Sequence, residues 1–300
     1  MFAIFTYIRL IIRIAFLVLT ERAVLSLSQI RKRPNVVGPW GVIQSVADRV
    51  KLITKNKIYL SPTSVLLYSL SPPLLTVLTR ILIITCPIPI PLSIISYSIL
   101  AIFCITSIIS LPFILLGISY RSVYSTVGSV RVVRLIMSYE ILLLLLIIFY
   151  RGSFTTSTWI PFVNQRFNSV SNITRFWLII PIIVLWLIEL RRTPFDLAER
   201  ESELVSRFNV EYRRWGFLLF FFSEILCLLT ISLIFSILIL QLTRIVTITC
   251  RIVRFVILSL YVRAALPRFR LLDTQSFVWF RLTPLVIFYR IVYIELRSII

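Results

Sequence analysis

The sequence predicts an all-α protein: a polytopic bundle of about eight transmembrane helices, with a long amphipathic loop after the first span and an acidic loop after the fifth. Of its 300 residues 59% are hydrophobic, against roughly 45–50% in an average soluble protein. The mean hydropathy is +0.97. Apolar runs of about 20 residues, the length that a helix needs to cross a bilayer, recur along the whole chain. These runs do not alternate with polar residues, which excludes a membrane β-barrel.

The first apolar run predicts a span at 2–20. We interpret it as a retained helix, because no small-residue cleavage site follows it. Arg9 and Arg13 lie four residues apart and therefore share one helix face. They either extend their charged ends to the nearer membrane surface or mark a functional site within the span.

A long polar loop is predicted to begin at Glu21. Its segment 34–41 holds two prolines and two glycines, which indicate tight turns. Val42, Val46, Val50 and Ile53 then recur at helical spacing among basic residues. This pattern predicts an amphipathic helix that lies in the membrane surface, with its lysines toward the lipid head groups.

The remaining apolar runs predict the other spans of a single membrane domain that covers 1–300. We place these spans at 64–86, 92–118, 130–150, 175–190, 215–240, 245–266 and 279–294. Most of the Lys and Arg residues outside the spans fall in the loops after the odd-numbered spans. The positive-inside rule therefore places these loops on the negative side of the membrane, in the cytoplasm or matrix.

The charge of the chain is strongly basic, with 32 Lys and Arg residues, 12 acidic residues and a net charge of +20. In a soluble protein this balance would suggest nucleic-acid binding. Here the basic residues lie mostly between the spans, so we expect anionic lipid such as cardiolipin as the partner, and no nucleic acid. The chain has no histidine, its four cysteines form no C-x-x-C pair, and no nucleotide-binding motif is present. We therefore expect no metal centre on this chain.

Acidic residues concentrate in the stretch 188–224, which runs from the end of the fifth span into the sixth. Seven of the 12 fall there: Glu189, Asp196, Glu199, Glu201, Glu203, Glu211 and Glu224. Thr193 and Pro194 match a helix N-cap followed by proline at the first helical position, which predicts a helix from Pro194. Asp196, Glu199 and Glu203 would lie along one face of it. The cluster either takes part in proton transfer or is a solvated loop held by salt bridges to nearby arginines.

Two further features suggest carboxylates inside the membrane. Glu140 follows Arg131 by nine residues, and Glu224 follows Trp215 by nine residues. If those residues mark where the two spans begin, a rise of 1.5 Å per residue places both carboxylates roughly 13 Å deep, near the middle of a ~30 Å hydrocarbon core. Burial disfavours the ionised form, so each could hold or release a proton near neutral pH. The alternative is a neutral acid hydrogen-bonded across helices, with no transport role.

Four segments resemble the family of respiratory complex I membrane subunit 1, the NADH–ubiquinone oxidoreductase chain 1 family. They are ERAVLSLSQIRKRPNVVGPWG at 21–41, SYE at 138–140, RRTPFDLAERESELVSRFNVEY at 192–212, and PRFR at 267–270. The resemblance implies a core membrane subunit that forms the membrane-side wall and entrance of the quinone-binding chamber and couples quinone reduction to proton translocation. Ubiquinone would be the substrate.

The resemblance also implies the partners and the location. NADH, flavin (FMN) and iron–sulfur clusters would be held by partner subunits only, with no redox centre on this chain. Those partners would be the quinone-site subunits of the peripheral arm and the antiporter-like membrane subunits. The location implied is the mitochondrial inner membrane, with a bacterial plasma membrane as the alternative.

Two sets of site residues follow from the resemblance, residue by residue. The positions that match the quinone chamber are Glu21, Arg22, Arg31, Phe208, Arg268 and Arg270. The positions that match the proton-coupling part are Glu140, Glu189, Arg192, Asp196, Glu199, Glu201, Glu203, Glu211, Tyr212 and Glu224.

Two other functions remain as alternatives: a stand-alone cation/proton secondary transporter that uses Glu140 and Glu224, and the anchor subunit of a membrane hydrogenase. The chain shows no repeat between its halves, which argues against the transporter. The chain also departs from the family, since Arg33, Arg200 and Arg207 stand where glycine is usual. Either the lineage has diverged with compensating partners, or these arginines were assigned by a codon table other than the organism's own.

Overall fold

The computed structural model describes residues 2–32, 37–38, 41–54, 65–86, 98–120, 123–152, 169–190, 192–195, 215–240 and 245–299. Within these ranges the chain is helical and contains no strand, as the sequence predicts. In chain order the helices are α1 (Phe2–Ser28), α2 (Gln44–Thr54), α3 (Val65–Thr85), α4 (Ser98–Ile108), α5 (Ser110–Tyr120), α6 (Val123–Gly152), α8 (Ser169–Glu189), α10 (Trp215–Leu240), α11 (Ile245–Ala265), α12 (Leu271–Phe277), the π-helical segment η2 (Val278–Leu282) and α13 (Thr283–Ile299).

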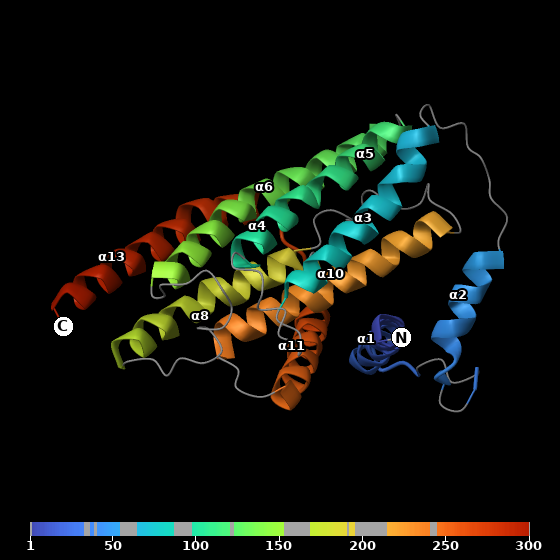
Figure 1. Cartoon of the computed structure of the whole chain (residues 1–300), viewed down its shortest axis with the longest axis horizontal. Helices are drawn as coiled ribbons and strands as arrows, with labels where there is room; N and C mark the ends of the chain where they lie inside the picture. The colour runs from blue at the N-terminus through green and yellow to red at the C-terminus, as the bar shows by residue number, and fades with distance from the viewer. Residues whose placement is uncertain are drawn as a thin grey trace.

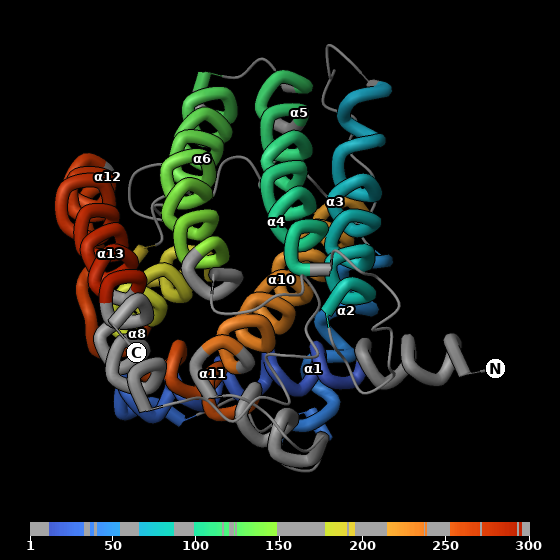
Figure 2. The backbone as a smooth tube through the Cα atoms, turned by 60° about the vertical axis from the view of Figure 1, so that its left-hand side comes forward, coloured from blue at the N-terminus to red at the C-terminus, as the bar shows by residue number. Residues whose placement is uncertain are grey.

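Helix α10 holds the bundle together. It packs against α3, α8 and α11 and also contacts α1 and α2. A row of helices lies beside α10: α3 comes first, then α4 and α5, which follow each other in the chain, and then α6 (Figure 1, Figure 2). Helix α13 lies beside α6 and α8. The core between these helices consists of isoleucine, leucine and aromatic side chains, among which Trp186 is fully buried. The predicted span at 215–240 coincides with α10, because its apolar run is continuous from end to end.

The beginning of the chain differs from the prediction. The first helix does not end at Thr20 but continues to Ser28, so Glu21 and Arg22 are helical and not part of a loop. A backbone motif ends the helix: the Arg31 N–H donates to the Ser26 carbonyl at 2.8 Å, and the Ile30 N–H donates to the Leu27 carbonyl at 3.2 Å. This motif requires positive φ at Ile30, which has φ 54°. No glycine occupies this position, so the usual signal for the end of a helix is absent there.

The predicted surface helix is present as α2. Gly38 and Gly41 precede it with φ of 73° and 71°, which confirms the predicted turns. The face that carries Val42, Val46 and Val50 is exposed in this chain. An apolar face directed away from the protein fits a helix that lies in the membrane surface.

Four other predicted spans differ from the helices of the structure. The span at 92–118 is two helices, α4 and α5, with a break at Ile109. Pro112 explains the break, because proline cannot donate a hydrogen bond to the carbonyl four residues earlier. Helices α6 and α8 begin at Val123 and Ser169, before the predicted 130 and 175. The last helical run begins at Leu271, before the predicted 279, because the polar residues at its start lie in helix α12.

Three of the described helical segments are long and apolar enough to cross a membrane: Leu66–Thr85, Ile99–Ser119 and Trp215–Ser236. Together with the helical fold, these segments indicate a polytopic membrane protein. The number of eight spans stays a prediction.

Helix α5 packs tightly against α6 at Gly117. A Cβ atom there would overlap the Ser129 hydroxyl and lie 2.6 Å from the Ser129 Cβ and 3.3 Å from the Ser125 carbonyl oxygen. Because that carbonyl belongs to the backbone, it cannot move aside as a side chain could. Gly128 is also helical, but a Cβ there would meet nothing within 4 Å.

We predict that Gly117→Ala destabilises the protein by about 1–3 kcal/mol, since it overpacks the contact between α5 and α6. Gly128→Ala is the matched control and should be neutral or stabilising by up to about 1 kcal/mol, because alanine favours helix. Thermal melts of the detergent-solubilised protein measure both. Equal melting temperatures for the two variants would contradict the predicted close packing.

Candidate functional site

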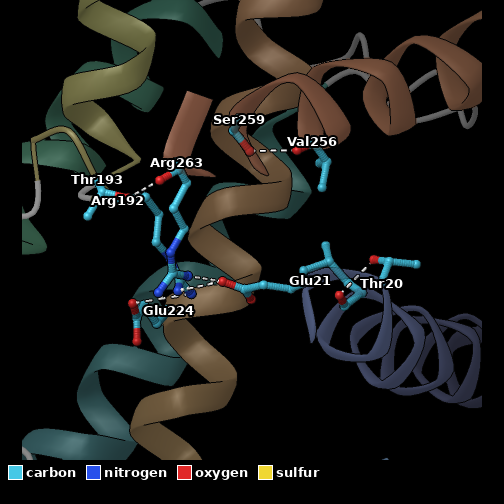
Figure 3. Close-up of polar contacts among 9 residues, drawn as sticks. Thr20, Glu21, Arg192, Thr193, Glu224, Val256, Ser259 and Arg263 are labelled. Carbon is cyan, nitrogen blue, oxygen red and sulfur yellow. Dashed lines mark hydrogen bonds and ion pairs between the residues drawn. The ribbon is translucent and has the colours of Figure 1, made fainter. Parts of the chain in front are cut away.

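A cluster of two acids and two arginines joins four parts of the chain. Arg192, just after α8, donates a hydrogen bond from Nη1 to Glu21 Oε1 at 3.0 Å, and Arg263 of α11 donates to the same oxygen. Arg192 Nη2 also lies 3.5 Å from Glu224 Oε1 on α10. Figure 3 shows the two guanidinium groups directed at the Glu21 carboxylate. We call Glu21, Arg192, Glu224 and Arg263 the ion-pair cluster.

The ion-pair cluster is largely shielded from solvent. The side chain of Glu21 is 11% exposed and that of Arg192 is 17% exposed. Charges at this depth are stable only while they are paired, because each loses most of its hydration. The two acids and two arginines balance in formal charge, so the cluster fixes α1, α10 and α11 relative to the end of α8.

Backbone and side-chain contacts hold the segment 192–195 in place beside the cluster. The Thr193 hydroxyl donates to the Arg263 carbonyl at 3.4 Å. The Phe269 N–H donates to the Pro194 carbonyl at 3.1 Å, and the rings of Phe195 and Phe269 lie 5.4 Å apart. The loops after α8 and α11 are therefore joined directly, which orients Arg192 toward Glu21.

The structure describes only Pro194 and Phe195 of the helix predicted from Pro194, and the rest of that prediction lies outside the described residues. Residues 193–195 form a turn, in which the Phe195 N–H donates to the Arg192 carbonyl at 2.9 Å. The peptide bond between Thr193 and Pro194 is cis, a geometry that the N-cap pattern did not anticipate.

A small cavity connects Glu224 to Glu189, the last residue of α8. It has a volume of about 40 Å³, and leucine, isoleucine and phenylalanine side chains form most of its wall. Glu189 also lines a second cavity of about 40 Å³ and a third of about 10 Å³. Tyr139 lines the third, and its buried hydroxyl lies close to Thr274. Glu189 is thus the side chain that all three cavities share.

The other predicted site residues within the described ranges lie apart from the ion-pair cluster. Arg22 is exposed and forms a 2.6 Å ion pair with Asp48 of α2. Arg31, Arg268 and Arg270 are exposed. All four therefore lie at the surface of this chain.

Glu140 is half-buried on α6 and lines none of the three cavities that contain Glu189. Helix α6 begins at Val123 and not near Arg131, whereas α10 begins at Trp215. Glu140 therefore lies farther from the start of its helix than Glu224 does from the start of α10. The helix starts no longer place the two carboxylates at the same depth in the membrane.

The remaining predicted site residues lie outside the described residues. They are Asp196, Glu199, Glu201, Glu203, Phe208, Glu211 and Tyr212.

Sequence reasoning missed Arg263 and Tyr139. Arg263 lies in the last turn of the seventh apolar run, and only its pairing with Glu21, 242 residues away, distinguishes it from other arginines at span ends. Tyr139 precedes Glu140 in the SYE segment and would have been found had the helix face next to that of Glu140 been considered.

The chain is similar to one family of known proteins. The family model described as NADH dehydrogenase matches residues 2–294. A chain named NADH-ubiquinone oxidoreductase chain 1 from Bradypus variegatus is 36% identical over 296 residues, which cover 93% of this chain and 90% of that protein. Chains of the same name from Carassius auratus and Hylobates lar are 35% and 33% identical, with 92% and 97% of this chain covered and 88% and 94% of theirs.

We predict that Arg192→Gln destabilises the protein by about 3 kcal/mol, because it leaves the shielded Glu21 and Glu224 carboxylates short of a positive partner. Arg22→Gln removes an exposed ion pair of the same chemistry from α1, the helix that carries Glu21, and it should cost at most about 1 kcal/mol. Thermal melts of both variants measure the difference. Similar losses would show that the ion-pair cluster is no more important to stability than a surface pair.

Proposed function

From the premise that the chain belongs to the NADH dehydrogenase family and is a subunit of NADH-ubiquinone oxidoreductase, respiratory complex I, we propose a role for it in the complex. The chain forms the membrane-side wall of the quinone chamber and couples quinone reduction to proton translocation. The observation that carries the proposal is the connection between the ion-pair cluster and Glu189. A shielded set of charges lies at one end, a carboxylate at the other, and a cavity large enough for water lies between them.

The coupling begins with the charge that the reaction creates. Reduction of a quinone to a quinol takes two electrons, supplied by the partner subunits, and two protons. Electrons that arrive before the protons leave negative charge on the quinone oxygens. In a low-dielectric chamber this charge attracts Arg192 and Arg263 and competes with Glu21 and Glu224 for them.

Glu224 is the carboxylate that this competition affects first. Its contact with Arg192, at 3.5 Å, is longer than the Arg192–Glu21 hydrogen bond of 3.0 Å. When Arg192 turns toward the quinone, Glu224 loses its positive partner and the neutral, protonated form becomes favoured. The reverse step releases that proton again.

The cavities give the direction of proton movement. The one between Glu224 and Glu189 has a volume of about 40 Å³, enough for a water molecule that bridges the two carboxylates. From Glu189 the path continues past Tyr139 and Thr274. A hydroxyl both accepts and donates, so these two side chains can pass a proton on without holding charge.

The predicted residues outside this path keep the roles that the family resemblance assigns. The acids of the loop after α8 bring protons from the negative side, and Glu140 extends the path beyond Tyr139. Arg22, Arg31, Phe208, Arg268 and Arg270 contribute to the chamber and its entrance.

The same proposal includes the location and the partners. The chain resides in the mitochondrial inner membrane, next to peripheral-arm subunits that hold NADH, FMN and iron–sulfur clusters and to antiporter-like membrane subunits. Cardiolipin neutralises its basic loops. The relatives named as quinone oxidoreductase chains argue against both the stand-alone transporter and the hydrogenase anchor.

We predict that Glu224→Gln or Glu189→Gln strongly reduces proton pumping, because an amide cannot carry the proton. Glu140→Gln should have the same direction of effect. Assembly should survive, since glutamine keeps the shape of the side chain. Pumping is measured as the NADH-driven pH gradient in proteoliposomes, and assembly as NADH oxidation by ferricyanide, which does not need the quinone site.

The matched control is Glu295→Gln, which replaces an exposed carboxylate on α13 outside the path. It should leave the pH gradient unchanged. Normal pumping in all three of the other variants would rule out these carboxylates as carriers.

A second prediction concerns the chamber. A photoreactive quinone analogue should label peptides of this chain around 192–214 or near Arg263, and excess ubiquinone should prevent the labelling. Arg192→Gln should weaken it. Labelling restricted to other subunits would remove this chain from the wall of the chamber.

A further inference from the structure

The largest cavity described in the chain is separate from the ion-pair cluster. It has a volume of about 700 Å³, within the roughly 300–1,000 Å³ typical of ligand pockets. Its wall is formed by α8, by the turn at Pro194 and Phe195, by the loop at Phe269, and by α12 and η2. None of the four residues of the ion-pair cluster lines it. Arg192 belongs to the ion-pair cluster, whereas Pro194 and Phe195 of the same turn line the cavity.

The walls of this cavity are apolar and rich in phenylalanine. Phe195, Phe269, Phe277 and Phe280 all line it, and the Phe280 side chain is 81% exposed in this chain. The loops after α8 and α11 lie on the same side of the predicted membrane, so the cavity lies where the hydrocarbon core meets the head groups. An exposed aromatic wall at this level is suited to the acyl chains of a lipid.

Two opposite charges line the same cavity, Asp273 of α12 and Arg281 of η2. Both are exposed, and within the described part of the chain no ion pair joins them to each other. The Arg281 guanidinium lies over the Phe277 ring, 6.0 Å from its centre, and therefore points back along the helix toward Asp273. The backbones of Asp273 and Arg281 are eight residues apart along the helix, or roughly 12 Å. The long arginine side chain shortens the distance between their charged groups.

The π-helical segment gives this arrangement its geometry. Val278–Leu282 interrupts the α-helical run and includes Phe280 and Arg281. Such insertions change the direction in which side chains leave a helix and occur frequently at functional sites. Here the segment brings an aromatic ring and a guanidinium into the wall of the same cavity.

We propose that this cavity binds a membrane phospholipid with a primary-amine head group. The acyl chains lie against the phenylalanine rings, the phosphate pairs with Arg281, and the ammonium pairs with Asp273. An anionic lipid without an amine would satisfy Arg281 but would meet repulsion from Asp273. The cavity shares no residue with the ion-pair cluster, and Thr274 is the residue that it has in common with the proposed proton path.

The test uses the intact complex in lipid nanodiscs and a phosphatidylethanolamine that carries a photoreactive group in its acyl chain. The label should appear in the peptide 266–281. Unlabelled phosphatidylethanolamine should compete better than phosphatidylglycerol by roughly two- to five-fold, the effect of one exposed ion pair. Asp273→Asn should abolish this preference for phosphatidylethanolamine. Arg281→Gln should weaken the competition by both lipids.

The apolar wall is tested in the same way. Phe280→Ala should reduce labelling by about tenfold, because a large part of the acyl-chain contact is lost. Phe288→Ala is the matched control, since Phe288 is 62% exposed on α13 and does not line the cavity. It should leave the labelling unchanged.

Three results would overturn the proposal. The first is a label that appears neither in 266–281 nor in 184–195, the two stretches that line the cavity. The second is equal competition by the two lipids with no response to Asp273→Asn. The third is competition by ubiquinone but not by phosphatidylethanolamine, which would make the cavity part of the quinone chamber and leave the proposed function intact.

Discussion

One carboxylate oxygen of Glu21 accepts hydrogen bonds from two arginines, Arg192 and Arg263, and the arrangement of the helices around it depends on this interaction. Neither arginine can leave without exposing a shielded negative charge. Because Arg192 also reaches Glu224, the positions of α1, α10, α11 and the end of α8 are coupled. A charge that appears near this cluster must therefore be felt by all four segments.

The turn at 192–195 connects this electrostatic centre to the rest of the molecule. On one side Arg192 pairs with the acids, and on the other side Phe195 packs against Phe269 and lines the proposed lipid cavity. A single short segment thus lies between a polar site and an apolar one. Its hydrogen bonds to α11 and to the loop after α11 hold the polar site and the apolar site in fixed positions relative to each other.

The sequence predicted much of the candidate site but not how it is arranged. Glu21, Arg192 and Glu224 were all identified by resemblance, and the structure brings them into contact. Arg263 was missed, because the span-end pattern does not show which of many arginines faces a carboxylate. Glu189 was one acid among seven in its region, and only packing showed that it lines three cavities.

By itself, the sequence determined the helical membrane class, the family, and most helix positions, because these follow from long apolar runs and specific local segments. Tertiary structure alone decided where α1 ends and which charges meet. The physical reason is that the spacing of apolar residues shows which face of each helix is buried or contacts lipid, and this depends on the local sequence alone. Pairing between residues as distant as Glu21 and Arg263 depends on how whole helices cross, and local sequence does not encode that.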